Sequence, residues 1–114
     1  NTVKCPINTY ALGRAYSAGC LVIMSGTGVR RAFPHCRIML HQLSSYNFGT
    51  LSAMDVYHQE ILAVQKVMNE LIAHHTGQPL EKVIEDVKHD KWMSAEEALE
   101  YGIVDEIVGK PRVR

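Results

Sequence analysis

A serine set between glycines is the first feature of this sequence that could do chemistry. Ser17 lies in the segment 13–19, between a strand-like run at 9–12 and an apolar, helix-like run at 20–24. Glycines on both sides let the chain turn sharply and keep the hydroxyl uncrowded at a helix N-terminus, where free backbone N–H groups can bind an oxyanion. This layout favours a nucleophilic serine. It is also typical of a helix N-cap or a close-packing site, so the rest of the chain must distinguish them.

A serine nucleophile needs a general base, and His41 and Asp90 are candidates to complete a triad. The serine usually gives its proton to a histidine whose other ring nitrogen is held by a carboxylate. His41 ends a predicted strand, and ligands bind at the carboxyl ends of strands in open α/β sheets. Asp90 follows a predicted helix, but Glu85 and Asp86 are also near, and spacing does not choose among the three. A structural histidine and a turn-capping aspartate are the alternatives.

Composition excludes several classes of function. The 12 Lys and Arg residues balance the 12 Asp and Glu residues of this 114-residue chain, so we expect no nucleic-acid partner and no anionic membrane partner. The longest purely apolar run, at 20–24, is far too short to span a bilayer. The chain starts abruptly in strand-like sequence, and we expect it to be the later part of a longer protein.

The cysteines indicate a reducing environment and no metal site. They are three in number and show no C-x-x-C spacing, which argues against both a disulfide framework and a zinc site. We expect the cytoplasm, or an organelle interior such as the plastid or mitochondrial matrix. The three are Cys5, Cys20 and Cys36.

Hydrophobic patterning predicts strands and helices in one α/β domain. A capping box, Ser94 with Glu97, opens a last helix that Gly102 closes, and the tail at 110–114 is basic and expected to be loose. Strands are expected at 9–12, 29–33, 37–41 and 103–108, and the other helices at 20–24, 52–75 and 80–87.

The helix predicted at 52–75 is too long for this domain to cover. At 1.5 Å per residue it would be roughly 36 Å long, so we expect part of it to project and to pack against another subunit. Ser52 is expected to cap it, and Thr76 and Gly77 to end it. Apolar residues spaced three and four apart form one stripe along it: Met54, Tyr57, Ile61, Val64, Met68 and Leu71.

Motifs spread nearly end to end resemble one family. They are Gly13-x-Ala15-x-Ser17-x-Gly19, Arg37-Ile38-Met39-Leu40-His41-Gln42, Asn69-Glu70-Leu71, His75-Thr76-Gly77 and the run from Ser94 to Asp105. Together they are similar to the proteolytic subunit of the ATP-dependent Clp (caseinolytic) protease, a serine peptidase of the crotonase fold superfamily. The resemblance implies one Clp protease-like domain over 1–114, lacking its N-terminal part, with a crotonase-like α/β fold and a long protruding handle helix.

The resemblance also implies roles for single residues and for partners. Ser17 matches the family's nucleophile, His41 its general base and Asp90 its orienting acid, while the backbone N–H of Ala18 matches one oxyanion donor. Such a subunit hydrolyses unfolded polypeptides to short peptides through an acyl-enzyme. It sits in two stacked seven-membered rings whose entry an AAA+ unfoldase controls. That partner uses the ATP, so no cofactor is expected on this chain.

Some positions depart from the family pattern. Tyr16 replaces a small residue before the nucleophile, Leu43 stands where the family has proline, and Lys88 and His89 stand where many members carry an Asp-Arg pair. These departures motivate a second hypothesis, a catalytically inactive ring subunit with a structural and partner-binding role. A crotonase acting on acyl-CoA thioesters is a third, at the level of the fold alone.

Overall fold

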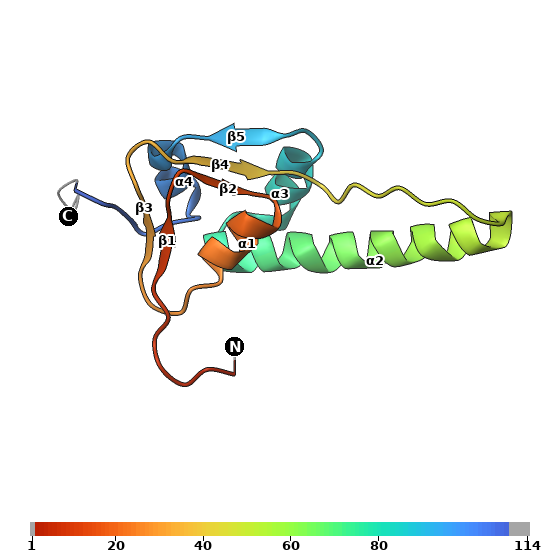
Figure 1. Ribbon diagram of the computed structural model, residues 1–114, viewed down its shortest axis with the longest axis horizontal. Helices are drawn as coiled ribbons and strands as arrows, with labels where there is room; N and C mark the ends of the chain where they lie inside the picture. Colours follow the sequence, from red (N-terminus) through yellow and green to blue (C-terminus); the bar gives the residue numbers. More distant parts are fainter. Residues whose placement is uncertain (1, 110–114) are drawn as a thin grey trace.

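Two small sheets and short helices form one end of the molecule, and a single long helix extends away from them (Figure 1). The computed structural model describes residues 2–109, so the predicted tail at 110–114 lies outside the described residues. The first sheet has the order β1-β3-β6 and its pairs are parallel. Its strands are β1 (Thr9–Ala11), β3 (Arg30–Ala32) and β6 (Glu106–Ile107).

The second sheet, of order β2-β4-β5, carries the candidate site at one edge. β2 (Arg14–Tyr16) pairs parallel with β4 (Arg37–Leu40), and β4 pairs antiparallel with β5 (Lys91–Met93). β2 and β5 could not be predicted from the sequence, because three residues are too few to show the alternation of apolar and polar positions that marks a strand. Gly13 separates β2 from β1 with φ of 73°, a left-handed conformation that glycine adopts without strain. The strand that leads to Ser17 is therefore β2 rather than the run predicted at 9–12.

The predicted helices are all present in the described chain. The capping box is confirmed: the Ser94 hydroxyl accepts from the Glu97 N–H at 3.2 Å, and the Glu97 carboxylate accepts from the Ser94 N–H at 2.7 Å. The strand predicted at 103–108 is shorter, since only β6 pairs while Ile103 and Val104 are buried in the core. The helices are α1 (Ala18–Met24), α2 (Leu51–Thr76), α3 (Leu80–Val87) and α4 (Ala95–Tyr101).

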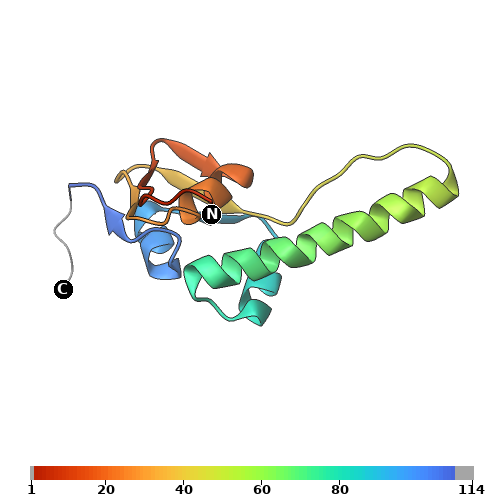
Figure 2. The same ribbon diagram turned by 90° about the horizontal axis from the view of Figure 1, so that it is seen from below.

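Helix α2 projects beyond the sheets, as its length predicted. In Figures 1 and 2 the segment that follows β4 runs out to the far end of α2, and the helix then returns to the sheets. Residues 51–60 are all exposed. The N-cap is Thr50 and not Ser52, because the Thr50 hydroxyl accepts from the Ala53 N–H at 3.3 Å and Ser52 already lies inside the helix. Gly77 ends the helix with φ of 74°, as predicted.

The face by which α2 docks differs from the predicted apolar stripe. Asn69 and Ile72 are the buried residues of α2, and Gln65 is half-buried beside them. Met54 and Leu71, at opposite ends of the stripe, stay 41% and 42% exposed. The stripe therefore overlaps the docking face only in part, at the half-buried Met68, and leaves apolar surface uncovered along the projecting helix.

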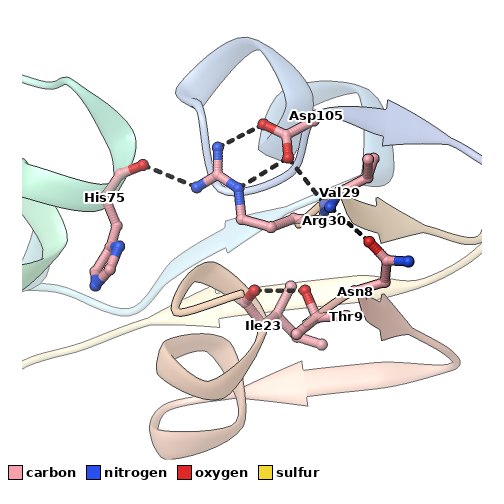
Figure 3. A network of polar contacts seen from close by, with 7 residues as sticks. All are labelled: Asn8, Thr9, Ile23, Val29, Arg30, His75 and Asp105. Atoms are coloured by element: carbon pink, nitrogen blue, oxygen red, sulfur yellow. Dashed lines mark hydrogen bonds and ion pairs between the residues drawn. The ribbon is translucent and has the colours of Figure 1, made fainter. Parts of the chain in front are cut away.

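Polar contacts join the ends of α2 and α4 to the first sheet (Figure 3). The Arg30 guanidinium donates to both oxygens of Asp105, at 2.6 and 3.1 Å, and to the carbonyl of His75 at 2.8 Å. The ion pair lowers the pKa of Asp105, chiefly through the hydrogen bond from Arg30. Gly102 has φ of 93°, and a Cβ there would lie 2.3 Å from the Thr76 carbonyl oxygen. The two helix ends thus meet where only glycine fits.

Candidate active site

Ser17 occupies a strained turn between β2 and α1. Its φ of 53° and ψ of −118° make it the one non-glycine residue with positive φ in the described chain. Its N–H donates to the Met39 carbonyl at 2.9 Å, and its carbonyl accepts from the N–H of Cys20 at 3.0 Å. A strained backbone held in place by its neighbours is common at functional sites.

The Ser17 hydroxyl is not used as a helix cap. Its side chain makes no capping hydrogen bond to α1, although the residue stands at the N-cap position. The N-cap alternative left open by the sequence therefore does not describe this residue. Ser17 lines a small pocket together with Leu21, Leu40, His41, Leu43, Gln65, Met68 and Ile72.

His41 lines the same pocket as Ser17. It follows β4 directly, and β4 is the parallel neighbour of β2, so both residues come from adjacent strand ends. The structure thus brings together the predicted nucleophile and the predicted base. The walls around them are otherwise apolar, apart from Gln65.

Asp90 lies at the same sheet edge but outside this pocket. Leu40 pairs with Lys91 in the antiparallel ladder, so the next positions beyond that pair are His41 and Asp90. The Gln42 N–H donates to the Val87 carbonyl at 2.7 Å, which ties the end of β4 to the helix that leads to Asp90. Asp90 itself is exposed, and within residues 2–109 it makes no hydrogen bond or ion pair.

The other two candidate carboxylates have partners of their own. Asp86 accepts from the Tyr101 hydroxyl at 2.9 Å and pairs with Lys82 and with Lys91. Burial acts to raise the pKa of Asp86, but these hydrogen bonds outweigh it and lower the pKa. Glu85 pairs with Lys88 at 2.6 Å. Of the three carboxylates, Asp90 is the one that has no hydrogen bond or ion pair within the described residues, and it lies opposite His41 in the continued register.

Tyr16 and Cys20 lie close to Ser17 in the sequence but do not line the pocket. The Tyr16 ring packs edge-to-face on Trp92, with centroids 5.0 Å apart, and it does not line the pocket. Burial raises the pKa of the Cys20 thiol to about 12, so it remains a neutral thiol. A buried neutral thiol is a poor nucleophile.

Gln65 is a pocket residue that sequence reasoning missed. A single glutamine in a long helix carries no motif, and the predicted stripe pointed to the adjacent face. Only the docking of α2 on the sheets reveals that Gln65 lines the pocket.

Within residues 2–109, no group of three or more His, Cys, Asp or Glu side chains is arranged to hold a metal ion. None of the helices in that range is long and apolar enough to cross a membrane.

Comparison with known proteins places the chain in a family. The family model described as Clp protease matches residues 1–111. The chain is 43% identical over 109 residues to the ATP-dependent Clp protease proteolytic subunit 2 of Chlamydia muridarum (strain MoPn / Nigg), covering 95% of this chain and 54% of that protein. It is 44% identical over 105 residues to the proteolytic subunit 2 of Chlamydia pneumoniae, covering 91% and 52%.

A third relative, the ATP-dependent Clp protease proteolytic subunit 1 of Chlamydia felis (strain Fe/C-56), is 41% identical over 109 residues, which cover 95% of this chain and 54% of that protein. The chain spans about half the length of the curated relatives it matches. The family predicted from the motifs is confirmed, as is the mixed α/β fold with its protruding helix. This chain belongs to the Clp protease family.

Proposed function

We propose that this chain carries the catalytic residues of a serine endopeptidase, with Ser17 as nucleophile, His41 as general base and Asp90 as orienting acid. The observation that supports it most is that Ser17 lies on a strained turn and lines the same pocket as His41. Its hydroxyl makes no capping hydrogen bond to α1. Family membership supports the same reaction class. Asp90 is supported by its position opposite His41 in the continued register.

The proposed reaction proceeds through an ester. His41 accepts the Ser17 proton as Oγ attacks the peptide carbonyl, and the N–H of Ala18 binds the resulting oxyanion. The imidazolium then gives its proton to the departing amine, which leaves an acyl-enzyme. Water, deprotonated by His41, hydrolyses the ester and restores the serine. Asp90 fixes the tautomer of His41 and stabilises the imidazolium once its side chain turns toward the ring.

The proposed setting is a compartmentalised, ATP-dependent protease. The curated relatives are named as proteolytic subunits of such a protease. We propose two stacked seven-membered rings of identical or mixed subunits, joined through the exposed apolar stripe on α2. An AAA+ unfoldase that consumes the ATP feeds in unfolded proteins, and this chain needs no cofactor. The three cysteines are all free, which fits the reducing cytoplasm or an organelle matrix.

Cleavage of short fluorogenic peptides by the full-length protein tests this function. Ser17→Ala is expected to abolish cleavage, because triad residues act as a unit. Ser25→Ala is the matched control: this hydroxyl donates to the carbonyl of Val22, outside the pocket, and cleavage should persist. Undiminished cleavage by Ser17→Ala would overturn the assignment.

A catalytically inactive ring subunit is the second candidate. One observation favours it: Asp90 is exposed and does not line the pocket in this structure. A wild-type protein that assembles into rings, yet neither cleaves peptides nor reacts with a fluorophosphonate, would establish this alternative.

A further inference from the structure

Gln65 bridges the chain just beyond His41 to the buried face of α2. Its side-chain oxygen accepts the backbone N–H of Leu43 at 2.6 Å, and its side-chain nitrogen donates to Asn69 Oδ1 at 2.7 Å. Asn69 is 8% exposed and is the buried polar residue of the described chain. Gln65 also lines the pocket that Ser17 and His41 share.

The orientation of the Gln65 amide is set by this arrangement. A glutamine side chain has one acceptor end and one donor end. Since its NH₂ group donates to Asn69, its oxygen faces Leu43. A partner that is itself buried holds the amide in this orientation more firmly than water would. The Leu43 N–H is therefore met by an acceptor that is fixed in place.

Few hydrogen bonds hold the backbone after His41. In the described chain, the segment 41–49 makes two hydrogen bonds to the rest of the molecule: the Gln42 N–H to the Val87 carbonyl at 2.7 Å, and the Leu43 N–H to Gln65. Residues 44–49 are exposed. The two bonds lie on consecutive residues and reach different elements, α3 and α2, so together they clamp the chain directly after His41.

We propose that Gln65 is a positioning residue that holds the backbone after His41, and through it the imidazole, in place against Ser17. The inference rests on the proposed function for its catalytic consequence. Gln65 reaches the chemistry only through Leu43, so its loss misplaces the base without removing it. A small misplacement of a catalytic group slows the chemical step.

Four variants of the full-length protein test this role. Gln65→Leu removes both hydrogen bonds while keeping the approximate size of the side chain. Gln65→Asn keeps an amide but is one methylene too short to reach both partners, and it serves if the leucine variant does not fold. Gln65→Glu keeps the acceptor for Leu43, and Asn69 can turn its amide to donate in return. Gln59→Leu is the matched control, the same change at an exposed position of the same helix.

Hydrogen exchange gives a readout that does not depend on activity. The Leu43 amide should exchange about three- to tenfold faster in Gln65→Leu and Gln65→Asn, the range expected for loss of one net hydrogen bond. It should keep the wild-type rate in Gln65→Glu and Gln59→Leu. Unchanged exchange in Gln65→Leu and Gln65→Asn would overturn the clamp itself, whatever the enzyme does.

Peptide kinetics then test the positioning role. We expect kcat to fall roughly tenfold in Gln65→Leu with KM within about twofold of wild type, and Gln65→Glu to recover most of kcat. A change confined to KM, or no change in kcat, would show that Gln65 is only a wall of the pocket. If the wild-type protein cleaves nothing, the proposed function fails while the exchange result still decides the clamp.

Discussion

His41 and Asp90 stand opposite each other at the first positions beyond the paired part of β4 and β5. The last pair of that ladder is Leu40 with Lys91, and the chain on both sides then leaves the sheet. Ser17 leaves β2 at the same edge, bonded through its N–H to Met39 of β4. A three-stranded sheet thus gathers residues from three distant parts of the sequence.

This relationship predicts different consequences for two nearby aspartates. Asp90→Asn should lower kcat/KM by about 100-fold or more while leaving the unfolding temperature unchanged, because an amide cannot stabilise the imidazolium. Asp86→Asn should instead destabilise the fold by about 1–3 kcal/mol, since Asp86 bonds Tyr101 and Lys91 in a half-buried site. Peptide kinetics and thermal unfolding of both variants check the pair. The opposite pattern, with activity dependent on Asp86 alone, would exchange their roles.

Gly102→Ala should strongly destabilise the protein. Its φ of 93° disfavours any side chain, and the new Cβ would lie 2.3 Å from the Thr76 carbonyl. We expect a loss of roughly 2 kcal/mol or more in the free energy of unfolding, measured by denaturant titration. Gly49→Ala is the control, since a Cβ there meets only Ala53 at an ordinary 3.7 Å. Equal stability of the two variants would contradict the close approach of α2 and α4.

The Arg30–Asp105 ion pair predicts a loss of stability in acid. Arg30 holds the pKa of Asp105 below its usual range, so the folded state binds this proton less tightly than the unfolded state. The stabilisation is therefore complete above the unfolded-state pKa of about 3.9 and disappears as the pH falls through the lower folded-state value. Asp105→Asn should flatten the dependence of the unfolding free energy on pH in this range. Asp55→Asn, at an exposed position of α2, should leave the slope as in wild type.

Much of the fold could be predicted from the sequence, because caps and periodic apolar runs are local signals. The capping box at Ser94 and the glycine stop after Thr76 depend only on neighbouring residues, and both are present. β2 and β5 were missed because their pairing is set by tertiary contacts and not by any pattern within three residues. The docking face of α2 differs from the predicted stripe because it includes two polar residues, Gln65 and Asn69, which are hydrogen-bonded to each other.

The residues of the candidate site also differ in whether local sequence signals can identify them. Ser17 and His41 could be chosen from the sequence, because one stands in a glycine-flanked turn and the other at a strand end. Asp90 could not be separated from Asp86 or Glu85, since the distinction depends on which carboxylates already hold partners in three dimensions. The roles of Ser17, His41 and Asp90 all stay predictions.

Mapping the site of fluorophosphonate modification tests most directly whether Ser17 is the nucleophile and His41 its base. Reaction of the wild-type full-length protein, followed by peptide mass spectrometry, should place a single adduct on the peptide that contains Ser17. The adduct should be almost absent in His41→Gln, because the serine then lacks its base. An adduct on another serine, or undiminished modification of Ser17 without His41, would contradict the account.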